Sequence, residues 1–141
     1  MTDVYVDVAA ASVEAGGAEV GSQLAAEPEA LRALRYLADA GIRVVLVTAG
    51  AGEPPGELRE AASDVMETIP VQPRGPAWYL TSDIARCQGA SARLRTVLIG
   101  GTPPSGSVRR CDAVARDVQA AAMEILAAVA MPARTEDGVA R

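Results

Sequence analysis

One stretch of the sequence, residues 74–101, constrains the fold more than any other. Within it, an apolar run at Trp78–Thr81 ends in Ser82-Asp83, and a second run at Thr96–Ile99 follows after a short helical segment. Buried strands of parallel sheets read as nearly continuous apolar runs, and open α/β sheets place their chemistry where such strands end. The stretch therefore predicts two parallel strands joined by a helix, with Asp83 at a carboxyl end.

The N-terminal part repeats this pattern of strand and helix. Val4–Val8 is a short β-rich run that carries Asp7, and Ile42–Val47 is the strongest strand in the sequence and ends in Thr48. Between them, acids and a proline open a helix over residues 27–41, whose leucines recur at helical spacing until a glycine ends it. A strand, a helix and a strand in this order form the unit of a right-handed parallel crossover.

The remaining segments extend the same architecture. We expect a loop or hairpin flap over residues 9–26, a helix around Glu57–Glu67, an edge strand bounded by prolines at Thr68–Val71, a brief strand at Ala113–Ala115 and a final helix over Val118–Val129. These elements predict an α/β fold: a single-domain, three-layer, Rossmann-like parallel sheet flanked by helices.

The composition excludes several classes of chemistry. The chain has 141 residues and a net charge of −5, all 13 basic residues are arginines, and it contains no histidine. The charge argues against non-specific nucleic-acid binding, and the missing lysine excludes Schiff-base chemistry. Without histidine there is no Ser-His-Asp triad and no His-ligated metal. A bound metal would have to be a hard ion such as Mg²⁺, held by carboxylates and carbonyls.

The two cysteines and the hydropathy suggest where the chain is found. Cys87 and Cys111 match no zinc or redox spacing, and we interpret them as buried thiols in a reducing cytoplasm. No apolar run approaches the roughly 20 residues of a membrane span, and the N-terminus lacks a signal-peptide pattern. We therefore expect a cytoplasmic protein that binds neither membranes nor nucleic acids.

Polar residues at three strand ends form the candidate site. Asp7, Thr48 and Asp83 each follow or end a predicted strand, and Arg74 lies in a loop just before one. Because the carboxyl ends of parallel strands share one edge of the sheet, these side chains are expected to converge. A divalent cation would relieve the repulsion between two carboxylates, and a hydroxyl with a guanidinium would suit phosphoryl oxygens.

This ordered set resembles the motifs of the haloacid dehalogenase (HAD-like) superfamily. The first motif is apolar residues followed by Asp-x-Asp, and here VYVDVA gives Asp7-Val8-Ala9. The second is a strand ending in Thr or Ser, here RVVLVT with Thr48, and the third is a basic residue, here Arg74 in PRGP. The fourth is a strand ending in Gly/Ser-Asp, here WYLTSD with Asp83. The resemblance covers about residues 4–100.

The resemblance implies a role for each matched residue. Asp7 would be the nucleophile that forms an aspartyl-phosphate, and it would also ligate Mg²⁺. The backbone carbonyl of Ala9 and the carboxylate of Asp83 would be further metal ligands. Thr48 would hydrogen-bond phosphoryl oxygens, and Arg74 would offset the negative charge around Asp7 and the phosphate.

Departures from the motifs imply a partly eroded site. Ala9 replaces the acid that normally protonates the leaving group, and losing such a group costs about 10²–10⁴ in rate. Cys87 stands where the fourth motif often carries another acid, and Arg74 cannot lose its proton as a lysine can. We expect retained Mg²⁺ and phosphate affinity with weak or no phosphatase activity. Relatives with alanine in the first motif that cleave carbon–phosphorus bonds require a cap-domain lysine, which this chain lacks.

Segment lengths bear on domain organisation and partners. Neither residues 9–26 nor residues 49–73 are long enough for the cap domain of many relatives. We expect a capless domain over residues 1–131 and a flexible tail over residues 132–141. In this family, an open site suits large phosphorylated substrates or is covered by a second subunit of a homo-oligomer.

Other interpretations remain open. A competent phosphatase could draw its acid/base from Glu14, Glu19 or a partner subunit, and a non-catalytic binding or assembly module could keep only the fold. Asp83 could simply cap the following helix, Thr48 could be a turn residue, and Arg74 could be a solvated surface charge.

Overall fold

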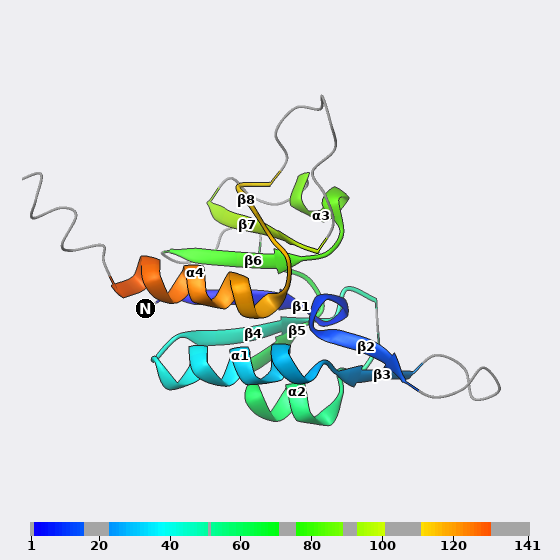
Figure 1. The fold of residues 1–141 in the computed structure, drawn as a ribbon. Helices are drawn as coiled ribbons and strands as arrows, with labels where there is room; N and C mark the ends of the chain where they lie inside the picture. The colour runs from blue at the N-terminus through cyan, green and yellow to red at the C-terminus, as the bar shows by residue number, and fades with distance from the viewer. Residues whose placement is uncertain are drawn as a thin grey trace, which may run out of the picture.

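The computed structural model describes residues 2–15, 23–50, 52–70, 76–88, 93–100 and 111–130. Its centre is a six-stranded sheet in the order β5-β4-β1-β6-β7-β8, in which every neighbouring pair is parallel (Figure 1). The strands are β1 (Asp3–Asp7), β4 (Arg43–Val47), β5 (Asp64–Met66), β6 (Ala77–Thr81), β7 (Leu94–Ile99) and β8 (Ala113–Ala115). The predicted parallel α/β sheet is confirmed.

Helices follow several of these strands, and a hairpin lies between β1 and the first long helix. The helices are η1 (Val8–Ala11), α1 (Pro28–Asp39), α2 (Gly56–Ala61), α3 (Ile84–Gln88) and α4 (Val118–Ala130). Between η1 and α1 lies an antiparallel hairpin of β2 (Ser12–Ala15) and β3 (Gln23–Ala26), one of the two forms expected for this segment. None of the helices among the described residues is long and apolar enough to cross a membrane.

The two faces of the sheet differ in what covers them. Helices α1, α2 and α4 lie together on one face, where Val4 and Val6 of β1 join the larger apolar core (Figure 1). The connection through α3 runs across the sheet in the opposite direction from the one through α1, so a right-handed crossover places α3 on the other face. There a smaller apolar cluster includes Tyr5 and Tyr79. Because side chains alternate along a strand, Asp7 shares this second face with Tyr5.

The region between α2 and β6 differs from the prediction. The helix expected over Glu57–Glu67 ends at Ala61, and Ala62 is already extended. The edge strand is β5, while residues 68–70 of the strand expected at Thr68–Val71 are not in a strand and Val71 lies outside the described residues. The apolar positions keep a helical spacing, but the amide of Ser63 donates to the carbonyl of Val44 and draws the chain into pairing with β4. An edge strand was correctly expected in this region, but its predicted bounds were wrong.

The interpretation of the cysteines as free thiols was wrong. Cys87 on α3 and Cys111 just before β8 form a disulfide, with their Cα atoms 5.4 Å apart. The two residues are separated by 24 positions, and the parallel packing of β7 between β6 and β8 brings them together. The bridge joins α3 to the start of the edge strand.

Candidate functional site

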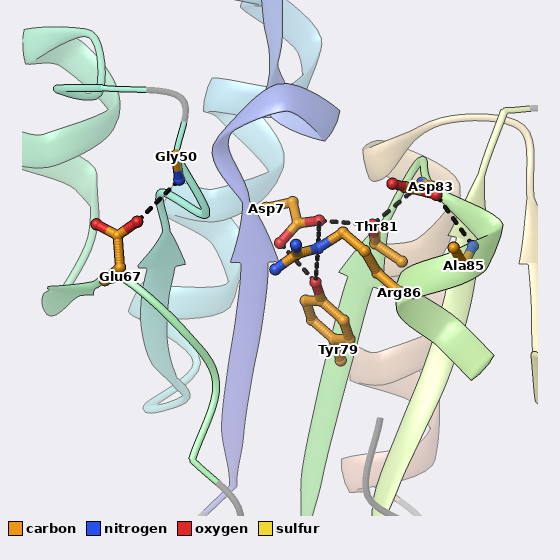
Figure 2. A network of polar contacts seen from close by, with 8 residues as sticks. All are labelled: Asp7, Gly50, Glu67, Tyr79, Thr81, Asp83, Ala85 and Arg86. Carbon is orange, nitrogen blue, oxygen red and sulfur yellow. Dashed lines mark hydrogen bonds and ion pairs between the residues drawn. The ribbon is translucent and has the colours of Figure 1, made fainter. Parts of the chain in front are cut away.

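Asp7 is a buried carboxylate at the carboxyl end of the central strand β1. The residue is 5% exposed, and β6 supplies two donors to it (Figure 2). The Tyr79 hydroxyl donates to Oδ1 at 2.7 Å, and Thr81 Oγ1 donates to Oδ2 at 2.5 Å. Both donors alternate along β6 onto the face that carries Asp7, so the strand register itself builds this contact.

Arg86 from α3 completes the group of residues around Asp7. Its Nε lies 3.0 Å from Asp7 Oδ2 and donates to the Tyr79 hydroxyl at 2.7 Å. Burial lowers the pKa of the Arg86 guanidinium, but the hydrogen bond to Tyr79 and the charge of Asp7 outweigh this and raise the pKa above its ordinary value. Burial, followed by the hydrogen bond to Asp7, raises the pKa of Tyr79 to about 12. Arg86 therefore stays charged and Tyr79 stays a donor at neutral pH.

Asp83 serves the helix that follows it. Its backbone amide donates to Thr81 Oγ1 at 3.1 Å, and its Oδ1 accepts from the amide of Ala85 at 3.0 Å, the contact of a helix-capping carboxylate (Figure 2). The residue is exposed. Asp83 is thus linked to Asp7 through Thr81, while its carboxylate holds the first turn of α3.

The loop after β4 contacts a carboxylate of this chain. Thr48 Oγ1 donates to Glu67 Oε1 at 3.1 Å. The amide of Gly50 donates to Glu67 Oε2 at 2.9 Å (Figure 2). Ala49 and Gly50 both have positive φ, at 50° and 85°, which turns the loop back on itself. Because Val47 is the register partner of Asp7, this loop begins one residue beyond the position of Asp7 on the neighbouring strand.

The other predicted site residues have fewer described contacts. Ala9 lies in η1, two residues beyond Asp7, with its side chain exposed. Arg74 lies outside the described residues, as does Glu19. The structure thus places Asp7, Thr48 and Asp83 at one edge of the sheet, each with a partner of its own.

Comparisons with known proteins identify the fold. No family model matches the sequence, and no curated protein matches it significantly. Among solved structures, the chain is similar to D,D-heptose 1,7-bisphosphate phosphatase from Burkholderia thailandensis, with a TM-score of 0.61, 19% identity, and coverage of 89% of this chain and 99% of that one. It is also similar to the enzyme of that name from B. bronchiseptica complexed with magnesium and phosphate, with a TM-score of 0.52, 16% identity, and coverage of 90% and 99%.

The chain has the HAD-like fold. The likeness spans almost the whole length of both structures, so the resemblance inferred from the strand-end motifs is confirmed at the level of fold.

The residues around Asp7 do not fit a magnesium ion in this arrangement. A carboxylate offers about four acceptor sites, and Tyr79 and Thr81 donate to two of those on Asp7. The positively charged guanidinium of Arg86 already lies 3.0 Å from Oδ2. The carboxylate of Asp83 faces the amide of Ala85 instead. Within the described ranges, no three acidic or cysteine side chains are grouped so that they could hold a metal ion.

Sequence reasoning missed four residues of this candidate site: Tyr79, Thr81, Arg86 and Glu67. Alternation along the predicted strand could have placed Tyr79 and Thr81 on the face of an aligned Asp7. The sequence gives no such signal for Arg86 or Glu67, because their partners lie 79 and 17–19 positions away in the chain.

Proposed function

We propose that this chain is a HAD-like hydrolase-fold protein whose phosphatase site is partly eroded, with weak or no phosphohydrolase activity. One observation carries the proposal: both oxygens of the Asp7 carboxylate are engaged by donors of the same chain. A carboxylate nucleophile must present an oxygen lone pair to phosphorus, and an oxygen held by a guanidinium and a hydroxyl is a poor nucleophile.

The first-motif substitution supports the same proposal. Ala9 has no group to protonate a leaving alcohol, although its position two residues beyond Asp7 is kept. Substitution of this position alone would lower the rate by about 10²–10⁴. The engaged Asp7 would lower it further.

The ligand class proposed for the site is a phosphorylated molecule or a phosphate-like anion. The Thr48 hydroxyl and the Gly50 amide are donors beside the end of β1, and both already hold a carboxylate, an anion with two acceptor oxygens. The similar enzyme from B. bronchiseptica was crystallised with phosphate and magnesium. Donors that hold a carboxylate suit the oxygens of a phosphoryl group.

Phosphate release from a generic aryl phosphate, with and without Mg²⁺, tests this proposal. We expect turnover at or near background for the wild type and background for Asp7→Asn. A slow activity that rises at least tenfold in Ala9→Asp would identify erosion at that position. Rapid Mg²⁺-dependent turnover by the wild type, abolished in Asp7→Asn, would instead establish a competent phosphatase and overturn the proposal.

A non-catalytic binding module is the second candidate, and the Asp7 contacts favour it. They join β1, β6 and α3 through buried polar bonds, which is a structural role independent of any substrate. The second function is the better description if two results are found together. Asp7→Asn lowers the free energy of unfolding, and neither the wild type nor the Ala9→Asp variant releases phosphate.

A further inference from the structure

Arg86 contacts Asp7, the carboxylate at which the sequence predicted a Mg²⁺ ion. The side chain of Asp7 is 7% exposed, and a buried carboxylate needs a positive partner. Arg86 supplies that charge through its Nε, 3.0 Å from Oδ2. The same nitrogen donates to Tyr79, which in turn donates to Oδ1, so the three side chains close a ring of contacts.

We propose that Arg86 is a built-in counter-ion that takes the place of the divalent cation at Asp7, so that Mg²⁺ binds Asp7 only when Arg86 leaves it. The inference deepens the proposed function, on which it rests for the assignment of Asp7 to the former phosphatase site. It assigns Arg86 as a positioning residue that acts through Asp7.

Geometry and charge put the two cations in competition for Asp7. Mg²⁺ binds carboxylate oxygens at about 2.1 Å and demands near-octahedral surroundings. An ion on Oδ2 would share that oxygen with the guanidinium, and the two positive charges would repel each other beside an almost fully buried carboxylate. An ion on Oδ1 would have to share that oxygen with the Tyr79 hydroxyl.

The short helix α3 keeps Arg86 in reach of Asp7. Asp83 caps the first turn of α3, and Cys87, the residue after Arg86, is bonded to Cys111 beside the edge strand. The Arg86 side chain itself is 32% exposed, so it has an open path to solvent. A rotamer change of this one side chain toward solvent would release Asp7.

Calorimetric titration of the full chain with Mg²⁺ tests the inference, with Arg86→Met as the main variant. Methionine keeps much of the length of arginine and removes the charge. We expect Mg²⁺ affinity at least tenfold higher in Arg86→Met than in the wild type, and lost again in the double variant Asp7→Asn/Arg86→Met. Arg32→Met is the matched control, because Arg32 makes an exposed ion pair with Glu29 at 3.8 Å and should leave Mg²⁺ affinity unchanged.

Arg86→Lys keeps the test decisive if the methionine variant does not fold. Lysine retains the positive charge, so its Mg²⁺ affinity should stay as low as that of the wild type, whereas Arg86→Gln, which is polar but neutral, should bind Mg²⁺ more tightly. Equal Mg²⁺ affinity in the wild type and the neutral variants would overturn the inference.

The outcome is separable from that of the proposed function. A wild type that turns over substrate while Arg86→Met binds Mg²⁺ more tightly would refute erosion and leave the counter-ion in place. An inactive wild type whose Mg²⁺ affinity is the same as that of Arg86→Met would support erosion and refute the counter-ion role of Arg86.

Discussion

Tyr79 is the residue that links the charges of this site. Its hydroxyl donates to Asp7 Oδ1 and accepts from Arg86 Nε, and the side chain is fully buried on the second face of the sheet. A hydroxyl in this position must keep its proton to hold Asp7. The raised pKa of Tyr79, about 12, shows that the surroundings favour the protonated form.

The pH dependence of unfolding should report this residue. Above pH 10 the unfolded chain loses the tyrosine proton while folded Tyr79 keeps it up to about pH 12, so stability is complete below pH 10 and falls as pH rises. We expect a loss of roughly 2–3 kcal/mol between pH 10 and pH 12, measured by urea unfolding. Tyr79→Phe should lower stability by about 2 kcal/mol at pH 7, because a hydrogen bond to a buried carboxylate is lost.

The difference in stability between Tyr79→Phe and the wild type isolates the titration of the Tyr79 hydroxyl. Burial also raises the pKa of Tyr5, but Tyr5 is present in both proteins and its contribution cancels. A variant whose stability declines as steeply as that of the wild type above pH 10 would show that Tyr79 is not the group responsible.

At the scale of elements, the loop after β4 and the end of β5 form one unit. The amides of Thr48 and Ala49 donate to the carbonyls of Met66 and Glu67, and the side chain of Glu67 then meets the donors of Thr48 and Gly50. The edge strand thus delivers a negative charge to the loop proposed to hold phosphate. Glu67 is exposed, so this charge can withdraw into solvent.

Removing the charge of Glu67 should therefore favour an external anion. We expect Glu67→Gln to bind inorganic phosphate about three- to tenfold more tightly than the wild type, because the charged carboxylate that competes with phosphate for Thr48 and Gly50 is gone. The glutamine amide oxygen can still accept one of these hydrogen bonds, so the loop keeps a partner when phosphate is absent. Calorimetry at constant ionic strength measures the change. Glu60→Gln, on the exposed face of α2, is the control for net charge. An equal gain in both variants would show that only overall charge matters.

At the scale of the whole molecule, the sequence predicted the sheet better than the site. Strand Arg43–Val47 could be predicted because burial on both faces needs nearly continuous apolar residues, here Val44–Val47, and this signal is local. The partner of Asp7 is not local, since Arg86 reaches it from a helix on the far side of β6. The position of β5 and the Cys87–Cys111 bridge also depend on pairing between distant segments. The sequence thus identified the acidic residues at the strand ends, but it did not identify the side chain that neutralises Asp7.

The disulfide provides a test at this largest scale. It closes a loop between residues separated by 24 positions, and the entropy removed from the unfolded chain by such a loop is worth roughly 3–4 kcal/mol. We expect Cys87→Ser/Cys111→Ser to lose about this much stability in urea unfolding, and dithiothreitol to lower the stability of the wild type to the same level. The reductant should leave the double variant unchanged, which separates cleavage of the bridge from other effects. Because the bridge ties α3 to the edge of the sheet, a wild type with equal stability in both redox states would mean that α3 is held in place by its other contacts, among them the Asp83 cap and the Arg86 ion pair.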